Sequence, residues 1–194
     1  GLLGFALAAV GGRRGAAVSL VAGVTPLASR SGVLRLVVGS AVVLRAAVLV
    51  TFVEASIVIL AAAVADFRPA QTSERKIKKE QLEQGARMTL ELVQNPDILQ
   101  EISARKGRRT VVGFAAESHD VVAAAQRKLA RKGCDLIVAN DISRADAGFE
   151  VDENAVLFVW PSGEIEELPL LSKSAVAAQL LDRIEKLRGD ASDL

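Results

Sequence analysis

The chain has 194 residues, 51% of them hydrophobic, which suffices for one domain with a full hydrophobic core. Its 24 Lys and Arg residues nearly balance its 23 Asp and Glu residues, so there is no overall basic field to attract nucleic acid. One cysteine, Cys134, and one histidine, His119, exclude an internal disulfide and a Cys/His zinc set, and we expect a cytoplasmic protein.

We expect no membrane span either. Such a span needs about 18 or more consecutive apolar residues. The most apolar stretch, 33–65, is broken into shorter runs by Arg35, Arg45 and Glu54. The chain begins without methionine and has no signal-peptide pattern, so we expect a domain whose N-terminal part is incomplete.

Short runs rich in Val, Ile and Ala alternate along the chain with helical patterns. The runs predict strands covered on both faces, at 16–22, 56–62, 110–116 and 135–139. Helices are predicted at 4–14, about 40–50, 97–105 and 119–132. This alternation is typical of βα units. We therefore predict one α/β domain over residues 1–194, with a Rossmann-like, mainly parallel sheet that carries helices on both faces.

Local signals set some of the boundaries. Asn95 is predicted to cap a helix whose first turn holds Pro96, and Gly133 to end the helix over 119–132. The C-terminal part reads as a hairpin of strands 154–160 and 164–168, followed by an amphipathic helix over 173–187.

Residues 67–87 interrupt the alternation. They contain Pro69, Gly85 and a dense mixture of Lys, Arg, Glu and Gln, which predicts a long, exposed, cationic flap. Loops of this length in compact domains are usually functional or disordered. The run Arg75–Lys79 taken alone is typical of a solvated loop.

Acids and amides follow three of the apolar runs. Asp66 comes after the run over 56–62, Glu117 after the next, and Asn140 and Asp141 after the third. In an open parallel sheet, ligands bind beyond the carboxyl ends of the strands. Each acid taken singly fits a cap of the next turn equally well, but together they predict a polar site at this edge.

Lys128 and Lys132 are the best candidates for an anion site. They lie four residues apart on one predicted helix face, where like charges repel by a few tenths of a kcal/mol. An anion between them would reverse that sign. The chain has no Gly-x-Gly-x-x-Gly and no Walker sequence. Gly1-Leu2-Leu3-Gly4 opens a predicted helix, and paired glycines at a helix start can let a phosphate approach the free amide groups.

Six short motifs follow one another in a recognisable order. They are 62–69 (AAVADFRP), 76–79 (KIKK), 95–99 (NPDIL), 112–117 (VGFAAE), 128–132 (KLARK) and 135–141 (DLIVAND). Together they resemble the bacterial phosphopantothenoylcysteine synthetase family, most strongly from about residue 56 onward. The resemblance implies a ligase that joins 4′-phosphopantothenate to L-cysteine with CTP and Mg²⁺, through a 4′-phosphopantothenoyl-cytidylate, in coenzyme A biosynthesis.

The resemblance also assigns roles to single residues. Asp66 resembles the Mg²⁺-linked nucleotide ligand and Lys76 the catalytic flap lysine that closes on the triphosphate. Lys128 and Lys132 resemble the paired helix lysines. The remaining nucleotide-binding positions are Leu60, Ala61 and Ala62, whose backbone reads the base, and Pro96, Asp97, Ile98, Leu99 and Phe114 in the nucleotide pocket.

The family resemblance further implies a homodimer and a flavin-dependent decarboxylase domain on the same or an associated chain. The apolar strand over 155–160 supports the dimer, since it has too few polar positions for a solvent-facing edge.

The chain departs from the family pattern near its start. Leu2 stands where the family has a lysine, and the asparagine that acts on the acyl-cytidylate is absent. Two alternative functions therefore stay open: another doubly wound nucleotide-binding reductase, or a degenerate module that serves only in dimerisation.

Overall fold

The computed structural model describes residues 1–73, 75, 78, 87–141 and 153–190. Its centre is a five-stranded sheet with the strand order β10-β9-β7-β6-β3. Three of these strands are parallel, and β9 and β10 are antiparallel to their neighbours. The bounds are β3 Ile57–Leu60, β6 Thr110–Glu117, β7 Leu136–Asp141, β9 Val156–Val159 and β10 Ile165–Glu167. The predicted α/β fold with a mainly parallel sheet is confirmed.

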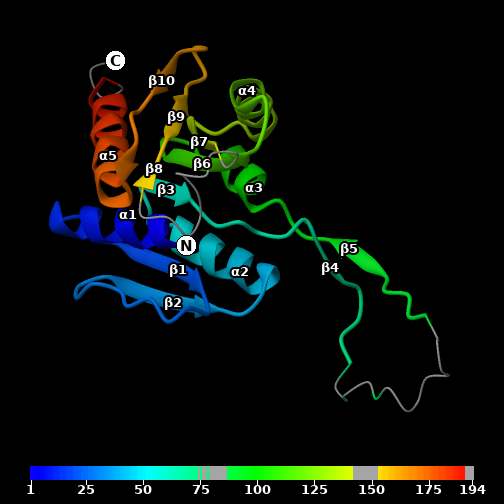
Figure 1. Ribbon diagram of the computed structural model, residues 1–194. Helices are drawn as coiled ribbons and strands as arrows, with labels where there is room; N and C mark the ends of the chain where they lie inside the picture. The colour runs from blue at the N-terminus through cyan, green and yellow to red at the C-terminus, as the bar shows by residue number, and fades with distance from the viewer. Residues whose placement is uncertain (74, 76–77, 79–86, 142–152, 191–194) are drawn as a thin grey trace.

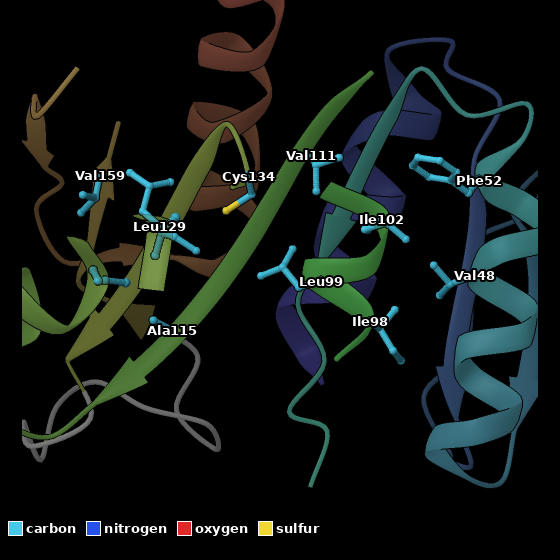
Figure 2. Packing of buried hydrophobic residues seen from close by; sticks show 13 residues of the cluster. Val48, Phe52, Ile98, Leu99, Ile102, Val111, Ala115, Leu129, Cys134 and Val159 are labelled. Atoms are coloured by element: carbon cyan, nitrogen blue, oxygen red, sulfur yellow. The ribbon is translucent and has the colours of Figure 1, made fainter. Parts of the chain in front are cut away.

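Helices cover both faces of this sheet (Figure 1). On one face lie α1 (Leu2–Arg13) and α5 (Lys173–Asp190), whose apolar side chains form one buried cluster with Val112 and Val138 of the sheet. On the other face lie α2 (Ala41–Phe52), α3 (Ile98–Ala104) and α4 (Val121–Lys132). Figure 2 shows the second buried cluster there, to which the helices contribute Val48, Phe52, Ile98, Leu99, Ile102 and Leu129.

Two parallel strands near the N-terminus form a separate small sheet. They are β1 (Ser19–Gly23) and β2 (Leu34–Val38), and α1 and α2 both contact β1. The sequence predicted a strand at 16–22, close to β1, but no strand at 34–38. The run in β2 is only five residues long and contains Arg35, and Leu34 and Val37 are exposed, so it lacks the fully buried pattern that marks the central strands.

A narrow antiparallel ribbon extends away from the body of the molecule (Figure 1). It consists of β4 (Phe67–Pro69) and β5 (Leu92–Gln94), and the backbone N–H of Ala70 continues the ladder by donating to the carbonyl of Glu91 (2.8 Å). The first residues of the predicted flap, 67–69, thus form a paired strand. Most of the flap, including Lys76, lies outside the described residues.

The predicted hairpin is confirmed, with a turn in which Gly163 adopts a φ of 89°. The apolar character of residues 155–160, which the sequence analysis took as support for a dimer, has another explanation in the structure. β9 lies between β7 and β10, and Val156, Phe158 and Val159 are buried. The apolar character of this strand therefore reflects its interior place in the sheet. Before α5, the short strands β8 (Glu153–Asn154) and β11 (Leu171–Ser172) pair with each other.

One predicted cap differs from the structure. The N-cap of α3 is Asp97, whose side chain accepts from the backbone N–H of Gln100 (3.1 Å), whereas the Asn95 side chain donates to the carbonyl of Ala65 (2.8 Å). Gly133 ends α4 with a φ of 67°, as predicted. In the part of the chain that the structure describes, no helix meets the length and apolarity that a membrane crossing requires.

Candidate functional site

The carboxyl ends of β3, β6 and β7 form one edge of the sheet. Leu60 at the end of β3 pairs with Gly113, and Glu117 at the end of β6 pairs with Asp141 of β7. Strand β6 thus extends four residues beyond the end of its neighbour β3, from Gly113 to Glu117. Leu60 and Ala61 pack against the two opposite core clusters, and Ala62 is exposed. The backbone assigned to base reading therefore lies at the carboxyl end of β3, at the edge where ligands bind in sheets of this type.

Asp66 lies at the root of the β4–β5 ribbon and is exposed. The sequence placed it at the end of a central strand, which is wrong, because β3 ends at Leu60. Its backbone carbonyl accepts from the N–H of Asn95 (2.7 Å), and Arg68 donates to the Asn95 side chain (3.1 Å). These contacts hold Asp66 next to the turn that leads into α3, while its own carboxylate faces solvent.

Asp97 connects this turn to helix α4. One carboxylate oxygen caps α3, and the other forms an ion pair with the ammonium of Lys132, whose side chain is only 11% exposed. Ile98 and Leu99 are core residues. Within the predicted pocket turn, only Pro96 and Asp97 thus have side chains outside the core, and any ligand contact from Ile98 or Leu99 would come from the backbone.

The ion pair changes the acidity of Asp97. Burial by itself raises the pKa of this carboxyl group. The hydrogen bonds from Lys132 and from the Gln100 backbone, together with nearby positive charge, outweigh burial, so the pKa lies below its ordinary value. The carboxylate form is therefore favoured by the fold.

Lys128 occupies the same face of α4 and donates to the backbone carbonyl of Phe114 (2.7 Å). Burial lowers the pKa of Lys128; Glu117 opposes this effect, and the positive charges of Lys132 and Arg131 add to it. Phe114 itself is half-buried and packs against the α1/α5 cluster. The ammonium thus lies close to the end of β6, in a setting where an added negative charge would stabilise it.

Each of the two lysines has a partner within the protein. The sequence suggested an anionic ligand between them. In the structure, the carboxylate of Asp97 already pairs with Lys132, and a backbone oxygen already accepts from Lys128. An incoming phosphate would therefore compete with Asp97 for Lys132.

The structure thus brings most of the predicted residues into one chain of contacts. Asp97, Lys132, Lys128 and Phe114 lie together, and Asp66 and Pro96 connect to them through Asn95. Lys76 lies outside the described residues. Within the described ranges, no group of three or more His, Cys, Asp or Glu side chains is arranged to hold a metal ion. A single carboxylate such as Asp66 fits Mg²⁺ only together with ligand phosphates and water, which is how this ion is commonly bound.

The fold and the site define a doubly wound α/β protein with paired lysines at the carboxyl edge of its sheet. The family model described as "DNA/pantothenate metabolism flavoprotein C-terminal domain" matches residues 1–187. The chain belongs to this family, in agreement with the synthetase resemblance read from its motifs.

Several curated relatives are similar over nearly the whole chain. The "Coenzyme A biosynthesis bifunctional protein CoaBC" of Vibrio vulnificus (strain YJ016) is 42% identical over 97% of this chain and 47% of its own length. The protein of the same name from Escherichia coli (strain K12) is 44% identical over 95% of this chain and 45% of its own length. The chain thus spans about half the length of the curated relatives it matches.

Solved structures agree with this fold. The C-terminal domain of a CoaBC protein superposes with a TM-score of 0.81 at 34% identity, covering 98% of this chain and 84% of that one. A Cab2 mutant in complex with phosphopantothenate-cysteine has a TM-score of 0.65 at 17% identity, covering 84% of this chain and 56% of that one, which supports the shared fold.

We predict that Asp97→Asn lowers the free energy of unfolding at pH 7 by up to about 1 kcal/mol, the upper range for a solvent-screened pair. Asparagine still caps α3 but leaves the ammonium of Lys132, whose side chain is mostly buried, without its counter-charge. Because the pKa of Asp97 is lowered by folding, its contribution is complete above about pH 5 and disappears as pH falls through the folded-state value. Urea unfolding of parent and variant at pH 7 and in acid measures the difference.

Glu91→Gln is the matched control, since Glu91 is an exposed acid of the β4–β5 ribbon, away from α3 and α4. Its stability should equal that of the parent at both pH values. A destabilisation of Asp97→Asn that persists unchanged in acid would contradict the ion-pair assignment.

Proposed function

We propose that this chain carries the phosphopantothenoylcysteine synthetase activity: it joins 4′-phosphopantothenate to L-cysteine and consumes CTP in coenzyme A biosynthesis. The family of the chain and the names of the relatives that match most of it support this proposal. The observation that carries the proposal is the placement of Lys128 and Lys132 on one face of α4, beside Asp97 and the end of β6. This is a cationic site at the edge of a doubly wound sheet, as a triphosphate requires.

The reaction has two steps. The carboxylate of 4′-phosphopantothenate attacks the α-phosphorus of CTP, the bond to the β-phosphate breaks, and pyrophosphate leaves. The amine of cysteine then attacks the acyl carbon of the 4′-phosphopantothenoyl-cytidylate, loses a proton, and CMP leaves. Both reactants of the first step are anions, so positive charge is needed to bring them together.

The residues of this chain provide that charge from fixed positions. Lys132 would exchange its contact with Asp97 for a phosphate oxygen, and Lys128 would bind a second oxygen while it stays anchored near Phe114. Asp66, exposed at the root of the ribbon, would hold Mg²⁺ jointly with the phosphates, and the ion would neutralise triphosphate charge. The backbone of Leu60, Ala61 and Ala62 at the end of β3 would contact the cytosine.

Lys76 is proposed to close on the triphosphate as the catalytic lysine. It follows β4 in the chain, and β4 begins directly after Asp66. Because the segment that carries Lys76 begins next to the proposed metal ligand Asp66, it could bring the lysine ammonium over the bound nucleotide. Arg75 and Lys78, on either side, are exposed.

We also propose that two copies of the chain associate through the β4–β5 ribbon in a cytoplasmic homodimer. The ribbon and its approach expose large apolar side chains, with Phe67 at 57%, Leu90 at 61%, Leu92 at 54% and Met88 at 53% exposure. Apolar side chains grouped on a two-stranded ribbon need a cover to be stable in water. A flavin-dependent decarboxylase domain on the same or an associated chain would account for the bifunctional relatives.

We predict that CTP with Mg²⁺ stabilises the chain by about 2.7 kcal/mol at 100 times its dissociation constant, and that ATP and GTP stabilise it less. Changing Lys128 and Lys132 together to Ala should remove this stabilisation, because the phosphates lose both helix cations. Thermal unfolding with and without each nucleotide measures the effect. A flavin or nicotinamide that stabilised the chain instead would favour a reductase, and no response to any nucleotide would favour a non-catalytic module.

Lys106→Ala is the matched control for the lysine variants. Lys106 also forms a partly buried ion pair, with Asp135 at the other end of β7 (2.5 Å). Its loss should lower the unfolding temperature yet leave the response to CTP intact. If the Lys106 variant loses the CTP response to the same extent, the helix lysines have no special role.

We predict that Asp66→Asn abolishes Mg²⁺-dependent CTP binding and leaves stability nearly unchanged, since only the backbone of Asp66 makes a described hydrogen bond. Calorimetric titration with CTP, with and without Mg²⁺, tests the binding. Glu91→Gln, which changes an exposed acid of the same ribbon, should bind like the parent. Parent-like, Mg²⁺-dependent binding by Asp66→Asn would remove it from the metal site.

We predict that Leu92→Glu converts the homodimer to a monomer, because it places a charge in the apolar surface of the ribbon. Light scattering at micromolar concentration should give twice 20.4 kDa for the parent and 20.4 kDa for the variant. Val50→Glu, at a site on α2 that is 74% exposed, is the control and should stay dimeric. A parent mass of 20.4 kDa would rule out the dimer.

A further inference from the structure

Asn140 has a buried side-chain carbonyl oxygen that no described residue satisfies. The residue lies near the end of β7 with 7% exposure, and its Oδ1 has no hydrogen-bond partner among the described residues. Its register partners on the two neighbouring strands are Ala116 and Val156, whose side chains cannot donate. A buried acceptor left unpaired destabilises a fold, so this oxygen calls for a partner that the described residues do not provide.

The position of Asn140 indicates where that partner lies. Along β7, Ile137 and Ala139 belong to the cluster under α3 and α4, whereas Leu136 and Val138 belong to the cluster under α1 and α5. Because side chains alternate along a strand, Asn140 lies on the α1/α5 face. It therefore stands at the ligand-binding edge of the sheet, on the face opposite to α4 and its two lysines.

This separation argues against the triphosphate as the partner of Asn140. Phosphate oxygens are acceptors and cannot donate to Oδ1. The ammonium of cysteine would donate, but it would bring a charge onto an apolar face, which is costly without a counter-charge. A neutral N–H or O–H on a substrate that is itself partly apolar fits the site better.

We propose that Oδ1 of Asn140 accepts a hydrogen bond from the amide N–H or the secondary hydroxyl of 4′-phosphopantothenate, and so determines specificity for this acid. The inference rests on the proposed function and names the residue that recognises its acyl substrate. The acid carries these two neutral donors between its carboxylate and its phosphate, next to a dimethyl carbon. Partly buried apolar side chains on the same face, Ala61 and Phe114, suit that dimethyl group.

The test is a cycle of ligand and protein changes, measured by calorimetric titration. One analogue of 4′-phosphopantothenate lacks the secondary hydroxyl, and a second has its amide nitrogen methylated. The parent should bind at least one analogue about tenfold more weakly than the natural acid, the factor expected for one hydrogen bond to a buried group. In Asn140→Leu, natural acid and that analogue should bind equally, while binding of CTP with Mg²⁺ stays as in the parent.

Asn154→Leu is the matched control. Asn154 is 4% exposed and its Oδ1 also has no partner among the described residues, but it lies on β8, outside the five-stranded sheet. This variant should discriminate between acid and analogue like the parent. Loss of discrimination in both variants would show a general structural effect and overturn the inference.

Further outcomes separate this inference from the proposed function. If the parent binds CTP and the acid but accepts both analogues equally well, the role of Asn140 is overturned without any variant, and the function stands. If Asn140→Leu discriminates between the natural acid and the analogue as the parent does, the role of Asn140 is likewise overturned and the function stands. If the parent binds neither CTP nor the acid, the proposed function fails and the inference fails with it.

Discussion

Helix α3 packs against strand β6 at Gly113, where the side chains of Leu99 and Ile137 fill the space that a side chain on this residue would need. A Cβ at Gly113 would lie 2.5 Å from Leu99 Cδ2 and 2.8 Å from Ile137 Cδ1, well inside van der Waals contact. The first turn of α3 is therefore pressed onto the sheet at the point where β6 runs beside the end of β3. This contact fixes the position of Asp97, and through Asp97 it fixes the ammonium of Lys132.

Charged side chains then hold α3 from both sides. On one side, Arg45 of α2 donates two hydrogen bonds of 2.6 Å to the carboxylate of Glu101. The same hydrogen bonds keep the pKa of Glu101 below its ordinary value, so the bidentate pair persists at neutral pH. On the other side, Asp97 pairs with Lys132 of α4. A phosphate that binds Lys132 would break the ion pair between Lys132 and Asp97. The core contacts and the Arg45–Glu101 pair would still hold α3, so phosphate binding need not move this helix.

Under the proposed function, the two faces of the sheet would bind different parts of the two anionic substrates. The α3/α4 face carries the lysines, which suit the triphosphate, and the α1/α5 face carries Asn140 among apolar side chains, which suits the neutral middle of the acid. The reacting carboxylate and the α-phosphorus would meet where the two faces join, beyond the ends of β3, β6 and β7. Such an arrangement keeps the cations on the nucleotide and leaves the acid to be oriented by hydrogen bonds.

The sequence by itself determined the central strands, the five helices and the lysine pair. These features follow from local patterns: apolar runs for buried strands, helical spacing for Lys128 and Lys132, and Gly133 as a helix end. The sequence motifs also indicated the protein family. Only the tertiary structure decided the rest, because it depends on contacts between residues distant in sequence. Asp66 lies at the root of a ribbon and not at a strand end. The N-cap of α3 is Asp97 and not Asn95, and the apolar strand β9 lies in the interior of the sheet. The sequence marked Asn140 only as a polar residue after an apolar run. That its oxygen has no partner among the described residues depends on the neighbouring strands, which place Ala116 and Val156 beside it.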